Sequence, residues 1–149
     1  AWHIEDAVPY VPVDEEPDIF ADPPANPWME PWIEQFYYEG LTTGCAANPL
    51  RYCPERGITR GEMAVFLLRA KYGTLWVPED VEPDIFIDVP SPGREWMEPW
   101  IEQFYEKGYT TGCGGTIPGV DLKYCPERNA GRAEMATFIV RIFGYPQLP

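Results

Sequence analysis

The chain has 149 residues, 45% of them hydrophobic and 15% aromatic, and its 11 basic and 24 acidic residues give a net charge of −13. This acidity argues against nucleic acid and anionic membrane surfaces as partners, because both are bound through a cationic footprint. The apolar content is ample for a packed core, so the charge imbalance does not indicate disorder. No run of about 18 apolar residues occurs, so the sequence predicts no membrane span.

Residues 1–16 read AWHIEDAVPYVPVDEE and predict an extended N-terminal arm rather than a helix. The apolar residues between Val8 and Val13 are compatible with an edge strand, whose prolines restrict hydrogen bonding to one side. A floppy terminus is the alternative. The first residue is Ala1, which fits either a mature secreted chain whose signal peptide has been removed or a trimmed chain.

Most of the remaining chain is one stretch written twice. Residues 16–73 and 82–144 share EPDIF, WMEPWIEQFY, TTGC and YCPER in the same order. A repeated unit usually buries its apolar face by stacking on a copy of itself, so we expect one joint core. The predicted organisation is an arm at 1–16, repeat 1 at 17–73, a linker at 74–81, repeat 2 at 82–144 and a tail at 145–149.

Each repeat predicts two helices separated by a long loop. In repeat 1 the first helix starts at Asn26 or Glu30, with a proline at its first position, and runs to about Glu39. The second starts at Thr59, whose hydroxyl can form a reciprocal capping box with Glu62. The residues expected on the buried faces of these two helices are Trp32, Ile33, Phe36, Tyr37, Met63, Phe66, Leu67 and Ala70.

Repeat 2 predicts the same two helices, with one difference at a helix start. Gly131 stands where repeat 1 has Thr59, so the hydroxyl cap is lost. Glycine in place of a threonine cap costs only a few tenths of a kcal/mol, so the helix is still expected. The residues expected on the buried faces are Trp100, Ile101, Phe104, Tyr105, Met135, Phe138, Ile139 and Ile142. The fold class is therefore mainly α, with tandem helix–loop–helix repeats, long loops and an extended arm.

The four cysteines fall two to a repeat, in the patterns C-x7-C and C-x11-C. These spacings fit short loop closure and lack the C-x2-C pairs typical of zinc, so we predict the disulfides Cys45–Cys53 and Cys113–Cys125. Each would stabilise its repeat by about 2.5–3 kcal/mol on the chain-entropy model. Buried free thiols or a four-thiolate metal site are the alternatives.

Acidic pairs occur on the first helix of each repeat and just before it. The helical pairs could suggest glycosidase chemistry or calcium binding, but a solvated helix face is the simpler interpretation. The pairs before the helices could also bind calcium, but turn and cap roles are favoured, so no metal site is predicted. The pairs are Glu30 with Glu34, Glu98 with Glu102, Asp18 with Asp22, and Asp84 with Asp88.

The single histidine, His3, lies in the arm, so the repeats cannot assemble a nucleophile with a histidine base. The loop at 112–115 is rich in glycine, but no lysine or strand context follows that would make it a phosphate cradle. We therefore predict that the chain is not an enzyme and needs no cofactor.

Several features together resemble the S-layer homology repeat. They are an Asp-Ile-Phe-x-Asp entry, a tryptophan at the first helix, a Thr-Thr-Gly after it, a loop closing on Cys-Pro, and Ile-Thr-Arg-x-Glu-Met-Ala opening the second helix. The match is closest at 58–70 and covers 17–73 and 83–144. The resemblance implies helix–loop–helix units, three of which commonly assemble about a pseudo-threefold axis and bind cell-wall polysaccharide in the grooves between them.

Carried over, the ligand-contacting arginine of that family falls on Arg60 and Arg132, and its aromatic groove residues fall on Trp28 and Trp96. The alternative for each arginine is a salt bridge to a carboxylate of the neighbouring repeat or chain. The chain also has more rings than two helical hairpins can hide, and surface aromatics mark protein interfaces or sugar-stacking platforms.

Two hypotheses follow. The first is a secreted, extracellular structural protein that self-assembles at the cell surface into a filament, sheath or surface layer. A neighbour would supply the missing third repeat, and the N-terminal arm would lie on an adjacent subunit. The second is an anchoring module that binds cell-wall or surface polysaccharide through Arg60, Arg132 and the tryptophans.

Overall fold

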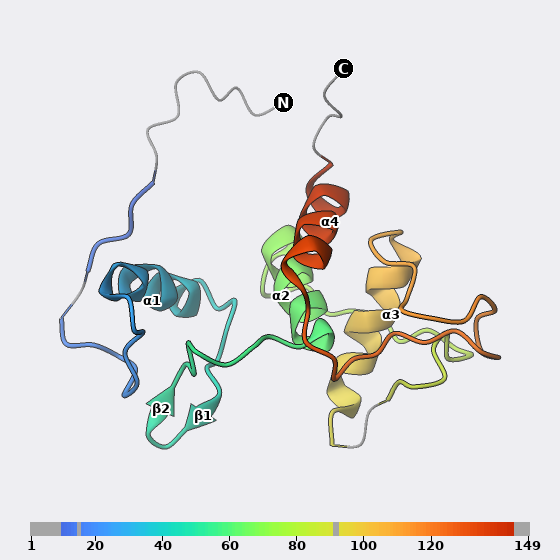
Figure 1. The fold of residues 1–149 in the computed structure, drawn as a ribbon, viewed down its shortest axis with the longest axis horizontal. Coiled ribbons are helices and arrows are strands. Elements are labelled where there is room, and N and C mark those ends of the chain that lie inside the picture. Colours follow the sequence, from blue (N-terminus) through green and yellow to red (C-terminus); the bar gives the residue numbers. More distant parts are fainter. Residues whose placement is uncertain (1–9, 15, 91–92, 145–149) are drawn as a thin grey trace. The chain divides into compact units, whose positions relative to one another are not determined.

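The structure is a computed structural model that describes residues 10–14, 16–90 and 93–144 (Figure 1). Helices make up most of its regular structure, so the chain is mainly α. It divides into two compact units, Ala1–Arg56 and Gly57–Pro149. The boundary lies within the first sequence copy, between its disulfide loop and its second helix. The second helix of copy one therefore belongs to the unit that contains copy two.

Within its described residues, the first unit holds one α-helix, which follows a 3₁₀ turn, and one short hairpin. The elements are η2 (Pro27–Met29), α1 (Glu30–Tyr38), β1 (Ala46–Ala47) and β2 (Leu50–Arg51). The helix begins at the second of its two predicted starts, with a proline in its first turn, where a missing N–H costs nothing. β1 and β2 pair antiparallel, with Ala46 opposite Arg51.

The part of the second unit that the structure describes contains α2 (Arg60–Tyr72), α3 (Glu98–Glu106), which follows η3 (Glu95–Met97), and α4 (Arg132–Phe143). The predicted capping box of α2 is confirmed, since Thr59 Oγ1 accepts from Glu62 N at 3.2 Å and Glu62 Oε2 accepts from Thr59 N at 3.0 Å. At α4 only half of the box forms, because Gly131 has no hydroxyl. Gly131 N donates to Glu134 Oε2 at 3.1 Å.

The core of the second unit is built around α2, which packs on η3, α3 and α4. In Figure 1, α2 lies beside α4. The predicted buried face of α2 is wrong in part, because Ala70 is exposed and Phe66 is only half-buried. Two neighbouring helices cover α2, so burial extends around more of it than one amphipathic stripe. The buried apolar side chains of α2 are Met63, Ala64, Val65, Leu67 and Leu68.

Several predicted segments lie at the limits of the described residues. Of the predicted arm, residues 1–9 and 15 lie outside them, as does the predicted tail at 145–149. Residues 10–14 form neither helix nor strand, and the ring of Tyr10 packs edge-on against Trp32 of the same chain at 6.3 Å between centroids. Among the described residues, no helix is long and apolar enough to cross a bilayer.

Candidate functional site

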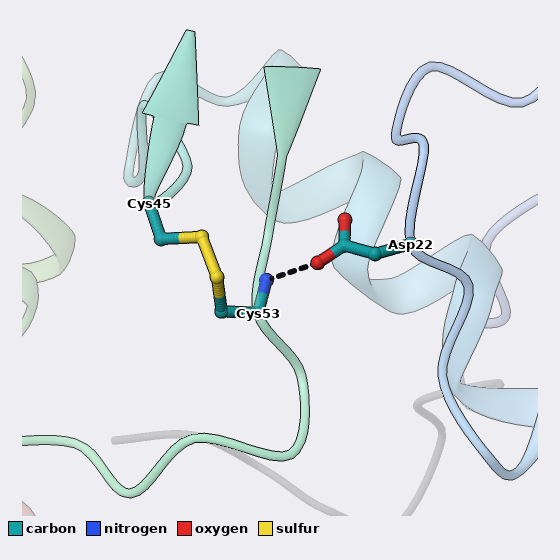
Figure 2. A group of neighbouring side chains, drawn as sticks. All are labelled: Asp22, Cys45 and Cys53. Carbon is teal, nitrogen blue, oxygen red and sulfur yellow. Dashed lines mark hydrogen bonds between the residues drawn. A yellow bond between two sulfur atoms is a disulfide. The ribbon is translucent and has the colours of Figure 1, made fainter. Parts of the chain in front are cut away.

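The first copy folds a loop around its disulfide. Cys45 is bonded to Cys53, and Asp22 reaches the same loop from the preceding segment. Its carboxylate accepts hydrogen bonds from Tyr52 N at 2.9 Å and from Cys53 N at 2.8 Å, and Figure 2 shows the second of these. Asp22 therefore fixes the loop by pairing backbone N–H groups, which is the turn role favoured by the sequence.

The second copy folds the same loop. Cys113 is bonded to Cys125, so the disulfides join the two pairs predicted from spacing, and none of the four thiols is left to bind a metal. Asp88 accepts from Tyr124 N and from Cys125 N, both at 2.8 Å. The two loops are therefore held by the same pair of hydrogen bonds to an aspartate, although the second loop is longer.

The aromatic packing beside each loop is also repeated. In each copy one phenylalanine meets two tyrosines edge-on, with centroid distances of 5.4 and 5.5 Å in the first copy and 5.3 and 5.4 Å in the second. The clusters are Phe20 with Tyr37 and Tyr52, and Phe86 with Tyr105 and Tyr124. The local frame is thus the same in both units.

The loop of the second copy encloses Arg60, the arginine at the start of α2. Its side chain is only 2% exposed. Nε donates to Tyr124 O at 2.9 Å, and Nη1 pairs with Glu134 Oε1 at 2.5 Å. The guanidinium carbon lies 4.7 Å from the centroid of the Tyr124 ring, a cation–π distance. Copy one therefore inserts its arginine into copy two, and Arg60 makes the inter-repeat salt bridge that was the alternative to a glycan contact.

The surroundings of Arg60 shift the pKa values of two neighbouring groups, Tyr124 and Glu134. Burial raises the pKa of Tyr124, whose hydroxyl donates to Arg60 O at 2.8 Å. Burial also opposes ionisation of Glu134, but hydrogen bonds from Gly131 N and Arg128 and the nearby guanidinium charges hold the pKa of its carboxyl below the ordinary value. Glu134 is therefore an anion whose ion pair holds the guanidinium of Arg60 in the loop.

The first turn of α2 is held by the same loop. Arg60 N donates to Arg128 O at 2.9 Å, and Gly61 N donates to Pro126 O at 3.0 Å, so the loop satisfies two N–H groups that a helix start leaves unpaired. A Cβ added to Gly61 would lie 2.9 Å from Met97 Sδ, so α2 approaches the second copy as closely as a glycine allows.

The other three predicted contact residues lie at the surface. Arg132 is exposed, in contrast to its equivalent Arg60. Trp28 and Trp96, at the same position in the two copies, are 67% and 54% exposed. Glycans or other chains can therefore reach these three side chains, but not Arg60.

The interpretation of the helical acidic pairs as a solvated face is wrong for one member of each pair. Glu34 and Glu102 are buried, because each turns inward to accept a backbone N–H from the segment before its helix. Glu34 accepts from Ile19 N at 2.9 Å, and Glu102 accepts from Ile85 N at 2.8 Å. Helical spacing alone could not reveal these loop partners.

Around Glu102 the carboxylates of Asp84 and Glu98 gather, with one oxygen of each lying within 4.8 Å of the others. Burial, followed by the charges of Asp84 and Glu102, raises the pKa of Glu98 to about 7. Carboxylate oxygens are ligands that Ca²⁺ takes. The two other groups of possible metal ligands among the described residues each combine one aspartate with two disulfide sulfurs, which are not available as thiolates.

No protein-family model matches the chain. The chain is similar to an endoglucanase of Bacillus sp. (strain KSM-635), with 26% identity over 126 residues. The match covers 85% of this chain and 12% of the endoglucanase. The chain thus spans a small part of that protein, and the similarity does not assign it a family.

Proposed function

We propose that the chain is a non-enzymatic, extracellular structural protein of S-layer-homology-like repeats that self-assembles into a filament, sheath or surface layer. The observation that supports this most is the set of large apolar side chains exposed on its helices. They include Trp28, Trp32, Tyr38, Trp96, Val140 and Phe143. Exposed apolar surface of this kind marks sites of association. The two disulfides fit an oxidising, extracellular setting.

The acidic cluster supports a structural role rather than catalysis. Glu102 is fully buried, and its two oxygens accept from Val81 N at 3.2 Å and Ile85 N at 2.8 Å. A catalytic carboxylate must come within hydrogen-bond reach of its substrate, so Glu102 is placed to hold the entry segment onto α3.

Sedimentation and negative-stain imaging of the purified chain over a range of concentrations test this proposal. We expect polymers whose mass grows with concentration, and a chain that stays monodisperse at high concentration would contradict self-assembly. Deleting residues 1–16 tests the proposed role of the arm on a neighbouring subunit. Loss of assembly is expected, and unchanged assembly would remove the arm from the interface.

A second function, anchoring to cell-wall polysaccharide, is favoured by the exposure of Trp28 and Trp96 at equivalent positions. Its test is a pull-down on purified wall glycan with the variant Trp28→Ala/Trp96→Ala and, separately, Arg132→Ala. Loss of binding in these variants is expected for a glycan site. Equal binding by the variants and the parent would end this alternative.

A further inference from the structure

The helices α2 and α4 are the same segment in two copies, but they differ in what covers them. In α2, the side chains of Arg60, Ala64 and Leu68 follow one another at i, i+4 spacing on one face, and all three are buried. The equivalent side chains of α4 are exposed. They are Arg132, Ala136 and Val140. One face of α4 therefore lacks the cover that its counterpart in α2 has.

The cover of α2 comes from the second copy. Arg60 enters the loop closed by the second disulfide, and α2 packs on η3 and α3. Further along, the guanidinium of Arg69 lies 5.3 Å from the ring centroid of Trp100 on α3. The second copy thus provides a loop that takes an arginine and a helix that receives the apolar face.

The first unit builds the loop of the same receiving surface, whereas Glu62, the equivalent of the Glu134 that pairs with Arg60, lies on α2 in the second unit. In the loop of the first unit, Gly44 N donates to Thr42 Oγ1 at 3.1 Å and Cys45 N donates to Arg51 O at 2.7 Å. The second copy has the same two bonds, also at 3.1 and 2.7 Å, at Gly112 and Cys113. The loop frame that holds an arginine in copy two is therefore already formed in copy one.

The helix beside that loop is less covered in the first unit. Met97, Ile101 and Phe104 on η3 and α3 are buried to 2% exposure or less. Their equivalents on η2 and α1, within the identical stretch WMEPWIEQFY, are only partly buried. They are Met29, Ile33 and Phe36. Trp32, the equivalent of Trp100, is 46% exposed although the ring of Tyr10 packs edge-on against it.

We propose that α4 of one chain docks on the first unit of a second copy of the same chain, with Arg132 entering the loop closed by Cys45–Cys53. The contact between α2 and the second copy is the template. In this arrangement Val140 packs on α1 of the second chain in the way that Leu68 packs on α3. Arg141 lies over Trp32 as Arg69 lies over Trp100. The inference rests on the proposed self-assembly and names the surface that carries it.

The two surfaces differ from each other, so the contact is head-to-tail. Each chain has one donor helix, α4, and one receiving surface, on its first unit. A heterologous contact of this kind extends into a filament or closes into a ring, whereas an isologous contact would stop at a dimer. This gives an experiment with separate donor and acceptor variants.

The donor variants are Arg132→Ala and Val140→Asp, both at exposed positions of the single chain. In the docked state the first variant lacks a buried arginine and the second lacks a buried apolar contact. We therefore expect each variant to raise the concentration needed for assembly by about tenfold or more. The matched control is Lys123→Ala, which removes one exposed cation outside α4. The control should assemble within about twofold of the parent.

The acceptor variant is Trp32→Lys, which places a cation opposite Arg141. It should also remain unassembled where the parent polymerises. The decisive step is to mix the two variants. Val140→Asp keeps a working acceptor surface, and Trp32→Lys keeps a working donor helix. We expect the mixture to form a dimer that grows no further, measured by analytical ultracentrifugation, with circular dichroism showing that each variant is folded.

The outcomes separate the two proposals. If the parent assembles and Val140→Asp assembles equally well, the docking surface is wrong although self-assembly stands. If the parent is monomeric at every concentration, both proposals fail. This holds also if α4 docks on the first unit of its own chain. If the mixture of variants forms long polymers, the contact is not head-to-tail.

Discussion

The first and second units contain the same helix sequence in different surroundings. Ile33 and Ile101 occupy the same position of WMEPWIEQFY, yet Ile101 is fully buried and Ile33 is partly exposed. The local frames agree closely, as the disulfide loops show. What differs is the helix that packs across α3, since α2 comes from the other copy. Burial in this chain is therefore set by the neighbouring copy more than by the segment itself.

The largest difference in stability between the two copies is expected at the two equivalent arginines. Arg60→Ala removes a buried cation from Glu134 and from the carbonyl of Tyr124. We expect a loss of about 3 kcal/mol in the free energy of unfolding, because the partners remain without it. Arg132→Ala, at an exposed position, should change the stability of the unassembled chain by less than about 0.5 kcal/mol. Urea denaturation at low protein concentration measures both, and equal losses would contradict the comparison.

A smaller effect is expected at the paired isoleucines. Ile101→Val removes one methyl group from a fully buried side chain and should cost about 1 kcal/mol. Ile33→Val should cost less than half as much in the unassembled chain, because Ile33 is partly exposed. The midpoints of urea denaturation report the difference, and matching midpoints would show that Ile33 is as well packed as Ile101.

The acidic cluster predicts a dependence on pH. The pKa of Glu98 is raised in the folded chain from its ordinary 4.5 to about 7, so the folded chain binds a proton more tightly than the unfolded chain. Its contribution to stability is complete below about pH 4.5 and is lost as the pH rises through 7. Melting temperatures of the parent should therefore fall between pH 5 and pH 8 more steeply than those of Glu98→Gln.

The control for this pH dependence is Glu106→Gln, at an exposed position on the same helix. It removes the same charge from the chain but leaves the cluster intact. Its melting curve should follow the parent across the pH range. A parent slope equal to that of Glu98→Gln would show that the cluster does not titrate in this range.

The smallest effect is expected at the start of α4. Gly131 has extended backbone angles of φ −77° and ψ 155°, which serine adopts without strain. Gly131→Ser supplies the hydroxyl acceptor that Thr59 provides for α2, so we expect a gain of a few tenths of a kcal/mol. Thermal unfolding of the variant beside Thr59→Gly, which should lose a similar amount, measures both caps.

Local features were predictable because their causes are local. The capping box at Thr59 and Glu62 depends on residues three apart, and the disulfide pairs depend on short loops. The partner of α2 was not predictable, since nothing in the apolar pattern of 60–72 says which copy covers it. The burial of Glu102 was also not predictable, because its N–H partners lie in a loop outside the helix.

The close approach at Gly61 has a further consequence for a polymer of this chain. Where α2 carries Gly61 against Met97, α4 carries Ala133, whose Cβ would meet the equivalent Met29. In the proposed contact between chains the thioether of Met29 must therefore shift to admit Ala133, which costs little at the end of a flexible side chain. A polymer of this chain would therefore contain two kinds of helix contact, one with a glycine at its closest approach and one with an alanine there.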